Sequence, residues 1–152
     1  MSRALSPVIG VLVLTALTVV LAASVGAVVA TEPVDPAPVA DLRVSVDAGA
    51  DQLTVRHAGG DAIPTDILRV RLRVAGTPVT HQPPVPFFAA RGFRSGPTGP
   101  FNPAAAGPWT AGETATLRLA STNSPGIDAG DPVHVTVATD GALLVDRTVP
   151  AT

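Results

Sequence analysis

The chain has 152 residues, enough for one domain with an appendage. Its ten basic and twelve acidic residues give a formal net charge of −2, and every basic residue is arginine, so no basic patch indicates nucleic-acid binding. The absence of cysteine excludes disulfides and thiolate metal sites. Because no Gly-rich phosphate loop, paired-carboxylate signature or serine elbow occurs, we expect no enzyme, no cofactor and no metal site.

The first thirty residues are almost free of charge. Residues 5–31 contain no charged side chain, and Arg3 is the only one before Glu32. A helix over residues 5–30 would be about 39 Å long at 1.5 Å per residue, longer than the roughly 30 Å hydrocarbon core of a bilayer. We therefore predict a transmembrane or assembly helix over residues 5–30, beginning at Ser6–Pro7 because Ser is a good N-cap and Pro is tolerated in the first turn.

Small residues recur at four-residue spacing in the second half of this helix. In a membrane, such spacing lets two helices approach closely. The alternative is an alanine-rich anchor that contacts no other helix. The candidate packing residues are Ala22, Ala23, Gly26, Ala27 and Ala30.

The same segment has the composition of a secretory signal. Its positively charged region would be very short, only Met1–Arg3, but a small-residue cleavage site exists at Val28–Ala30. A signal peptide cleaved near Ala30 and an uncleaved anchor both remain alternatives.

The first ten residues carry a family resemblance. They read Met-Ser-Arg-Ala-Leu-Ser-Pro-Val-Ile-Gly and precede a long apolar run. This string resembles the N-terminus of archaeal type IV pilins, especially those of halophiles, in which a basic, a small and an apolar residue precede Ser-Pro-Val-Ile-Gly. The matching residues are Arg3, Ala4, Leu5, Ser6, Pro7, Val8, Ile9 and Gly10.

The resemblance implies a processing step and an assembly. A prepilin peptidase would remove a leader of residues 1–4 by cutting between Ala4 and Leu5 on the cytoplasmic side. The retained helices would then pack side by side as the core of a filament. Bacterial pilins have a glutamate at the fifth mature position, where this chain has Ile9, so no charge pairing at that position can drive assembly.

Residues 31–40 are rich in proline and contain two acidic residues. Proline-rich segments are extended and semi-rigid. We predict a linker here that separates the helix from the remainder of the chain.

Apolar residues alternate with polar ones in several short runs from residue 41 to residue 152. A period of two indicates strands with one buried and one solvated face, as in antiparallel sheets. We therefore predict a mainly β chain with one N-terminal α-helix and a small antiparallel β-sandwich headgroup of about six strands. The alternating runs cover residues 42–46, 53–55, 68–74, 117–119, 133–137 and 143–149.

Two strings within this domain have competing interpretations. His57–Asp61 contains Gly-Gly and indicates a turn that ends the second strand, although its His and Asp could also be a metal-ligand pair. Arg69, Arg71 and Arg73 share one face of a strand. They form either a solvated face or a contact surface for carboxylates or another anionic surface.

Residues 76–112 interrupt the alternation. They hold eight of the sixteen prolines and every aromatic residue of the chain. A loop of this length is unusual in a compact domain. Its aromatic residues either complete the core or form an exposed interface; they are Phe87, Phe88, Phe93, Phe101 and Trp109.

From these features we predict a structural subunit, major or minor, of an archaeal type IV pilus-like surface filament used for adhesion or surface attachment. Its partners would be the prepilin peptidase, other pilin subunits and the membrane. Before assembly the N-terminus would be cytoplasmic and the β-domain extracytoplasmic. The alternatives are a singly anchored extracytoplasmic binding domain and a secreted protein cleaved near Ala30.

Overall fold

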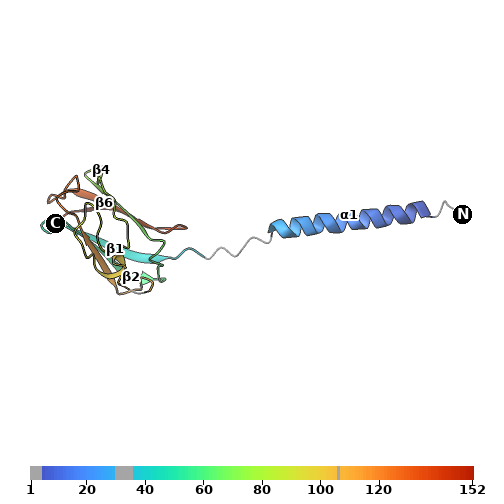
Figure 1. Cartoon of the computed structure of the whole chain (residues 1–152), viewed down its shortest axis with the longest axis horizontal. Coiled ribbons are helices and arrows are strands. Elements are labelled where there is room, and N and C mark those ends of the chain that lie inside the picture. Colours follow the sequence, from blue (N-terminus) through green and yellow to red (C-terminus); the bar gives the residue numbers. More distant parts are fainter. Residues whose placement is uncertain (1–4, 30–35, 106) are drawn as a thin grey trace. The chain divides into compact units, whose positions relative to one another are not determined.

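The computed structural model describes residues 5–29, 36–105 and 107–152 (Figure 1). The chain divides into two compact units, Met1–Pro36 and Ala37–Thr152, and each is described by itself. The predicted leader residues, Ala30 and the linker residues up to 35 lie outside the described residues.

Helix α1 (Leu5–Val29) is the only element of the first unit in the described part of the chain. Its 25 residues correspond to about 38 Å. The helix begins one residue before the predicted Ser6–Pro7 start, and helix ends are commonly uncertain by this much. The predicted apolar helix is confirmed.

Three hydroxyl groups within α1 are satisfied by the helix itself. Thr15, Thr18 and Ser24 each donate to the carbonyl oxygen four residues earlier, at 2.8, 2.7 and 2.8 Å. Such bonds remove the cost of placing a hydroxyl in an apolar environment. The polar residues of α1 therefore do not prevent it from lying in lipid or against other helices.

The second unit is built from two antiparallel sheets, which confirms the predicted fold class. The alternating runs form strands because each can bury one face and leave the other in water. The first sheet has the order β1 (Ala40–Asp47), β2 (Gln52–Gly60), β5 (Thr114–Arg118), and the second has the order β4 (Thr77–Pro78), β3 (Arg69–Val74), β6 (Pro132–Ala138), β7 (Leu143–Pro150).

The core lies between the sheets and consists of the alternate apolar residues of the strands. On β3, for example, Val70, Leu72 and Val74 are buried while the arginines between them are exposed. On β2, Leu53 and Val55 are buried in the same manner. Burial of such side chains contributes about 1.5–3 kcal/mol each relative to exposure.

The C-terminal residues connect the edges of the two sheets. The Thr152 N–H donates to Val46 O at 3.0 Å, and the Ala48 N–H donates to Thr152 O at 2.9 Å. Arg147 on β7 occupies a core-facing register position opposite Val135, yet it is exposed. A charge in such a position discourages the pairing of an edge strand with another chain.

The predicted turn at His57–Asp61 is wrong, because β2 continues through Gly60. Beyond the strand end, the Asp61 N–H donates to Val39 O at 2.8 Å, and the Asp61 carboxylate accepts from the Val39 N–H at 3.1 Å. Gly60 has a φ of +102°, and a Cβ atom there would lie 2.3 Å from Val39 O. The glycine is needed for close approach of two segments, not for a reversal of the chain.

The long segment between β4 and β5 packs against the edge of the first sheet and against the core. Isolated bridges join Phe93 to Leu119, Thr98 to Thr116 and Trp109 to Ile63. The short 3-10 helix η1 (Gly99–Phe101) holds Phe101, which is fully buried. The segment is therefore irregular in hydrogen bonding but is part of the folded domain.

Candidate functional site

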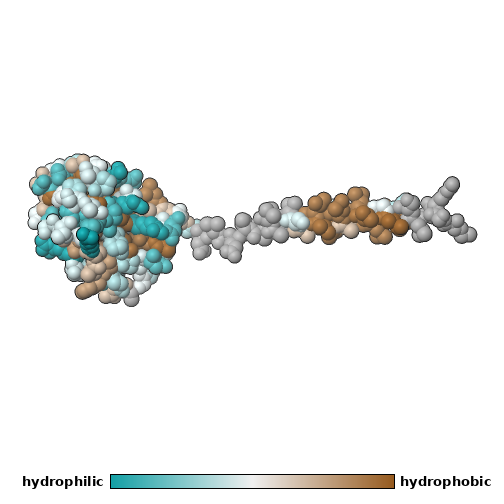
Figure 2. Space-filling view, turned by 45° about the horizontal axis from the view of Figure 1, so that its top comes forward, coloured by the Kyte–Doolittle hydropathy of each residue, from teal (hydrophilic) through white to brown (hydrophobic). Residues whose placement is uncertain are grey.

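Helix α1 has no polar face. Every side chain that the structure describes on it, from Pro7 to Ser24, is exposed, and most are Val, Leu, Ile or Ala. In Figure 2 the coloured part of this helix is mostly brown with a few pale atoms, whereas the β-domain mixes teal, white and brown. A helix that is apolar all round requires a surrounding membrane or neighbouring apolar helices.

The length and composition of α1 fit the same conclusion. Residues Pro7–Ser24 form a segment long and apolar enough to cross a membrane, and this segment contains no charged residue. A signal sequence would satisfy the same criterion, so the choice depends on the motif at its N-terminal end.

The structure places only part of the predicted processing motif. Arg3 and Ala4 lie outside the described residues, and Leu5–Gly10 form the first turns of α1. Pro7 lies in the first turn, where its missing N–H leaves no carbonyl unpaired. The site of cleavage therefore stays a prediction.

Four of the five candidate packing residues lie in the C-terminal half of α1. Ala22 and Gly26 lie one above the other on one face, because residues four apart share a face of an α-helix. Ala22 and Ala23 are exposed, Gly26 and Ala27 lie within the helix, and Ala30 lies outside the described residues. The packing of α1 through these small residues stays a prediction.

The five aromatic residues of the long loop fall into two groups. Phe101 and Trp109 are fully buried with ring centroids 5.6 Å apart, and Phe87 and Phe93 pack together at the same distance, each 6% exposed. Phe88 is 64% exposed. Four aromatics thus lie in the core, and Phe88 alone among them is available on the surface of the isolated chain.

His57 is a buried polar residue of β2. Its Nε2 atom lies 2.9 Å from Asp61 O, and its ring makes an edge contact with Trp109 at 6.0 Å between centroids. Its Nδ1 atom is buried without a hydrogen-bond partner. Within the described ranges no group of three or more His, Cys, Asp or Glu side chains could hold a metal ion, so the metal-ligand interpretation has no third ligand there.

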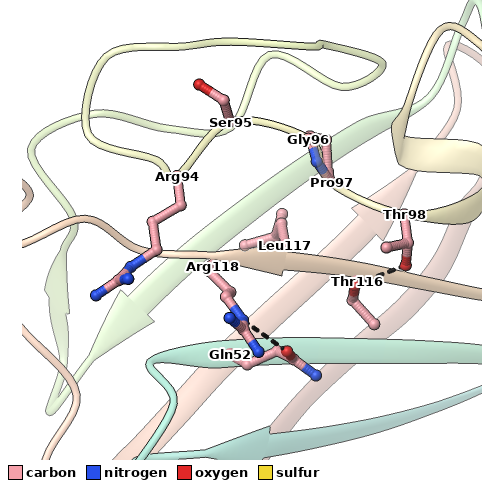
Figure 3. A pocket seen from close by; sticks show the side chains of 9 residues that line it. All are labelled: Gln52, Arg94, Ser95, Gly96, Pro97, Thr98, Thr116, Leu117 and Arg118. Carbon is pink, nitrogen blue, oxygen red and sulfur yellow. Dashed lines mark hydrogen bonds between the residues drawn. The ribbon is translucent and has the colours of Figure 1, made fainter.

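A cavity of about 320 Å³ lies at the free edge of β5 (Figure 3). Main-chain hydrogen bonds at two points hold a loop against this edge. The Arg94 N–H donates to Arg118 O at 2.9 Å, and Thr98 and Thr116 exchange two bonds, at 3.0 and 3.3 Å. Between these two points the loop rises away from the strand and leaves the cavity. It is lined by Gln52, Arg94, Ser95, Gly96, Pro97, Thr98, Thr116, Leu117 and Arg118.

Two further cavities lie along β3, beside the predicted arginine row. They share Arg71 and Gln82, and their volumes are about 370 and 330 Å³. Arg69 pairs with Asp140 at 2.7 Å, and both side chains are more than half exposed. An exposed pair of this kind contributes about 0–1 kcal/mol to stability. Neither Arg71 nor Arg73 has a carboxylate partner in the described part of the chain.

Sequence reasoning missed two side chains that hold the loop in place. The amide of Gln82 accepts from Leu72 N at 2.8 Å and donates to Leu72 O at 2.9 Å, so it caps the free edge of β3. The amide of Asn123 bonds His81 N and O in the same manner, both at 2.9 Å. Neither position lies in a period-two run, so no local pattern indicated these two contacts.

The comparison with protein families bears on the N-terminal segment. The family model described as archaeal type IV pilin, N-terminal, matches residues 3–42, which include the processing motif and the whole of α1. The predicted resemblance to archaeal type IV pilins is confirmed. The pilin match supports a structural subunit that associates with a membrane and with other pilin subunits.

One relative extends the similarity beyond the pilin segment. An uncharacterized protein of Archaeoglobus fulgidus is 39% identical to this chain over 71 residues. The match covers 45% of this chain and 50% of the relative, so the chain spans about half the length of the curated relative it matches.

Proposed function

We propose that this chain is a subunit of an archaeal type IV pilus-like surface filament that serves adhesion or surface attachment. A prepilin peptidase cuts between Ala4 and Leu5, α1 enters the filament core, and the β-domain forms the outer surface. Before assembly, the N-terminus is cytoplasmic and the β-domain is extracytoplasmic.

One observation carries this proposal. The pilin match includes the motif from Arg3 to Gly10 and continues without interruption through α1 to Leu42 on β1. A signal peptide removed near Ala30 would discard the helix that the family model matches. A helix that is kept in the mature protein agrees with this match, and its apolar surface then requires a membrane or other helices around it.

The processing step is tested by N-terminal sequencing of the protein recovered from cells that contain the pilus assembly machinery. We expect a mature N-terminus at Leu5. Arg3→Glu and Ala4→Glu should each leave the precursor uncut, whereas the matched control Ser2→Ala, outside the motif, should be cut as wild type is.

Two results would contradict the proposal in different ways. A mature N-terminus at Thr31 would replace it with ordinary secretion. Correct cleavage at Leu5, but no protein in a sheared surface fraction even with a co-expressed major pilin, would leave a singly anchored extracytoplasmic domain.

A further inference from the structure

The cavity at the edge of β5 has a fixed cationic wall. The Arg118 Nε–H donates to Gln52 Oε1 at 2.9 Å, and the Gln52 amide nitrogen donates to Thr54 Oγ1 at 3.2 Å. This chain of bonds orients the Arg118 guanidinium before any ligand arrives, and it leaves the terminal guanidinium nitrogens available. Preorganised groups lose less entropy on binding than free ones.

Arg94 supplies a second positive charge at the same end of the cavity as Arg118, because the Arg94 N–H is bonded to Arg118 O. Its side chain is exposed and has no hydrogen-bond or carboxylate partner in the described part of the chain. No acidic residue lines the cavity. In the sheet register, Asp47 lies two strands away from Arg118, and its carboxylate is already bonded to the Ala50 N–H. The cavity therefore favours an anion.

The remaining lining is suited to a polyhydroxylated ligand. The hydroxyls of Thr98 and Thr116 are 2.7 Å apart, so one donates to the other and the second retains a hydrogen for a ligand. Ser95 has an exposed hydroxyl, which points away from β5 in Figure 3, and the buried residues Pro97 and Leu117 also line the cavity. Figure 3 shows the Thr98 and Thr116 hydroxyls facing each other beside β5.

An exposed aromatic residue adjoins this opening. The Gly96 N–H, at the top of the loop, donates to Phe88 O at 2.7 Å, so the main chain of Phe88 abuts the rim of the cavity. Phe88 is 64% exposed, although the other four aromatics of the loop are buried. An exposed aromatic beside convergent polar groups is typical of a binding surface, because its flat apolar face can cover a ring of a ligand.

We propose that this cavity binds a carboxylated sugar unit of an acidic polysaccharide. Arg94 and Arg118 hold the carboxylate, the Thr98–Thr116 pair bonds a ring hydroxyl, and Phe88 covers an apolar ring face. Arginine suits the first role because its planar guanidinium can donate two parallel bonds to a carboxylate. The proposal deepens the attachment role proposed above and rests on it, since the β-domain must be outside the cell to meet such a polymer.

The test is calorimetric titration of the purified full-length protein in detergent with oligogalacturonate. We expect measurable binding that weakens as salt is raised, and no binding of a neutral oligogalactan of equal length. Arg94→Gln and Arg118→Gln should each weaken binding roughly tenfold, the loss expected for a charged hydrogen bond. The matched control Arg91→Gln, on the same loop but outside the cavity lining, should bind as wild type does.

Three outcomes would overturn the proposal. The first is that oligogalacturonate does not bind. The second is that the Arg91→Gln control loses as much affinity for oligogalacturonate as the cavity variants do. The third is that a poly-aspartate peptide of equal charge binds more tightly than oligogalacturonate, which would assign the cavity to acidic proteins. The sheared filament fraction is measured separately for the same variants. Normal filament levels with lost sugar binding in the Arg94→Gln and Arg118→Gln variants would support a binding role that is separate from assembly. Absence of filaments from wild type would contradict the proposed function and not this site.

Discussion

The two units of this chain obtain their stability from different sources. The β-domain encloses its own core of alternate strand residues, completed by four aromatics of the long loop. Helix α1 presents apolar side chains in every direction and buries none of those described. The domain therefore depends on contacts within the chain, and the helix depends on a membrane or on other helices.

This difference predicts that substitutions in the two units have separable effects. Changes in α1 should alter insertion or assembly and leave the unfolding of the β-domain unchanged. Changes in the domain core should have the reverse effect, because distant sites without shared partners act independently.

The largest effect is expected from Gly26→Leu. Lipid and a filament core are similarly apolar, so hydrophobicity alone cannot move the helix from one to the other, and close packing at small residues must contribute. The substitution keeps the helix apolar but adds bulk on the face shared with Ala22. We expect most of the sheared, sedimentable filaments to be lost while the amount of protein in the membrane is unchanged.

The matched control is Leu12→Ile, which changes side-chain shape on α1 without adding bulk, and it should assemble as wild type does. The assay requires the remaining assembly machinery, because a minor subunit depends on a major one to polymerise. Normal filaments from Gly26→Leu would remove the small-residue face from the assembly hypothesis.

The next effect is expected in the β-domain. Trp109 is fully buried between Phe101 and His57, and its main chain is bonded to Ile63 in both directions, at 2.8 and 2.9 Å. Trp109→Ala should lower the free energy of unfolding by about 3–5 kcal/mol, as for other large buried aromatics. Cleavage at Leu5 and membrane insertion should be unaffected.

Phe88→Ala is the control for Trp109→Ala. Phe88 is on the same loop but exposed, so thermal or denaturant unfolding should change by less than about 0.5 kcal/mol. Equal losses in the two variants would mean that the loop contributes through its conformation and not through the burial of particular rings.

The strands were predictable because the residues of each strand alternate between apolar side chains that face the core and polar side chains that face water. On β3 and β6, the alternation of valine or leucine with polar residues marks which side chains are buried. The arrangement of the long loop was not predictable, since it depends on contacts between residues far apart. Trp109 pairs with Ile63, and the Asn123 amide bonds the main chain of His81, 42 residues away.

The functional residues also include one group that the sequence predicted and one that it did not. The motif from Arg3 to Gly10 is contiguous, so the sequence alone indicated the pilin family. The cavity at β5 combines Gln52 of β2, the 94–98 loop and Arg118 of β5, and only the register of three segments brings them together. Surface sites assembled from separate segments leave no local pattern in a sequence.

The smallest effect on stability is expected from substitution of Glu113, which follows Trp109 by four residues. The Thr110 N–H and hydroxyl donate to its carboxylate at 2.6 and 2.9 Å. The main-chain bond from Thr110 is the largest cause that lowers the pKa of Glu113 below the usual range, and the Thr110 hydroxyl bond is the second. Slight burial raises this pKa, and the charge of His57 lowers it by a smaller amount. The folded protein thus prefers the ionised form more strongly than the unfolded chain does.

A lowered pKa in the folded state fixes the sign of the pH dependence. The stabilisation is complete at pH values above the usual glutamate pKa, and it is lost as the pH falls through the lower pKa of the folded protein. Glu113→Gln keeps the shape but removes the charge, so wild type should be the more stable at neutral pH. The difference in the free energy of unfolding between wild type and Glu113→Gln should shrink as the pH falls below the usual glutamate pKa.

Thr110→Val removes only the hydroxyl bond and should produce part of the effect. Chemical denaturation of the three proteins at several pH values measures this dependence, and a difference that stays constant with pH would show that the turn is stabilised by shape and not by charge.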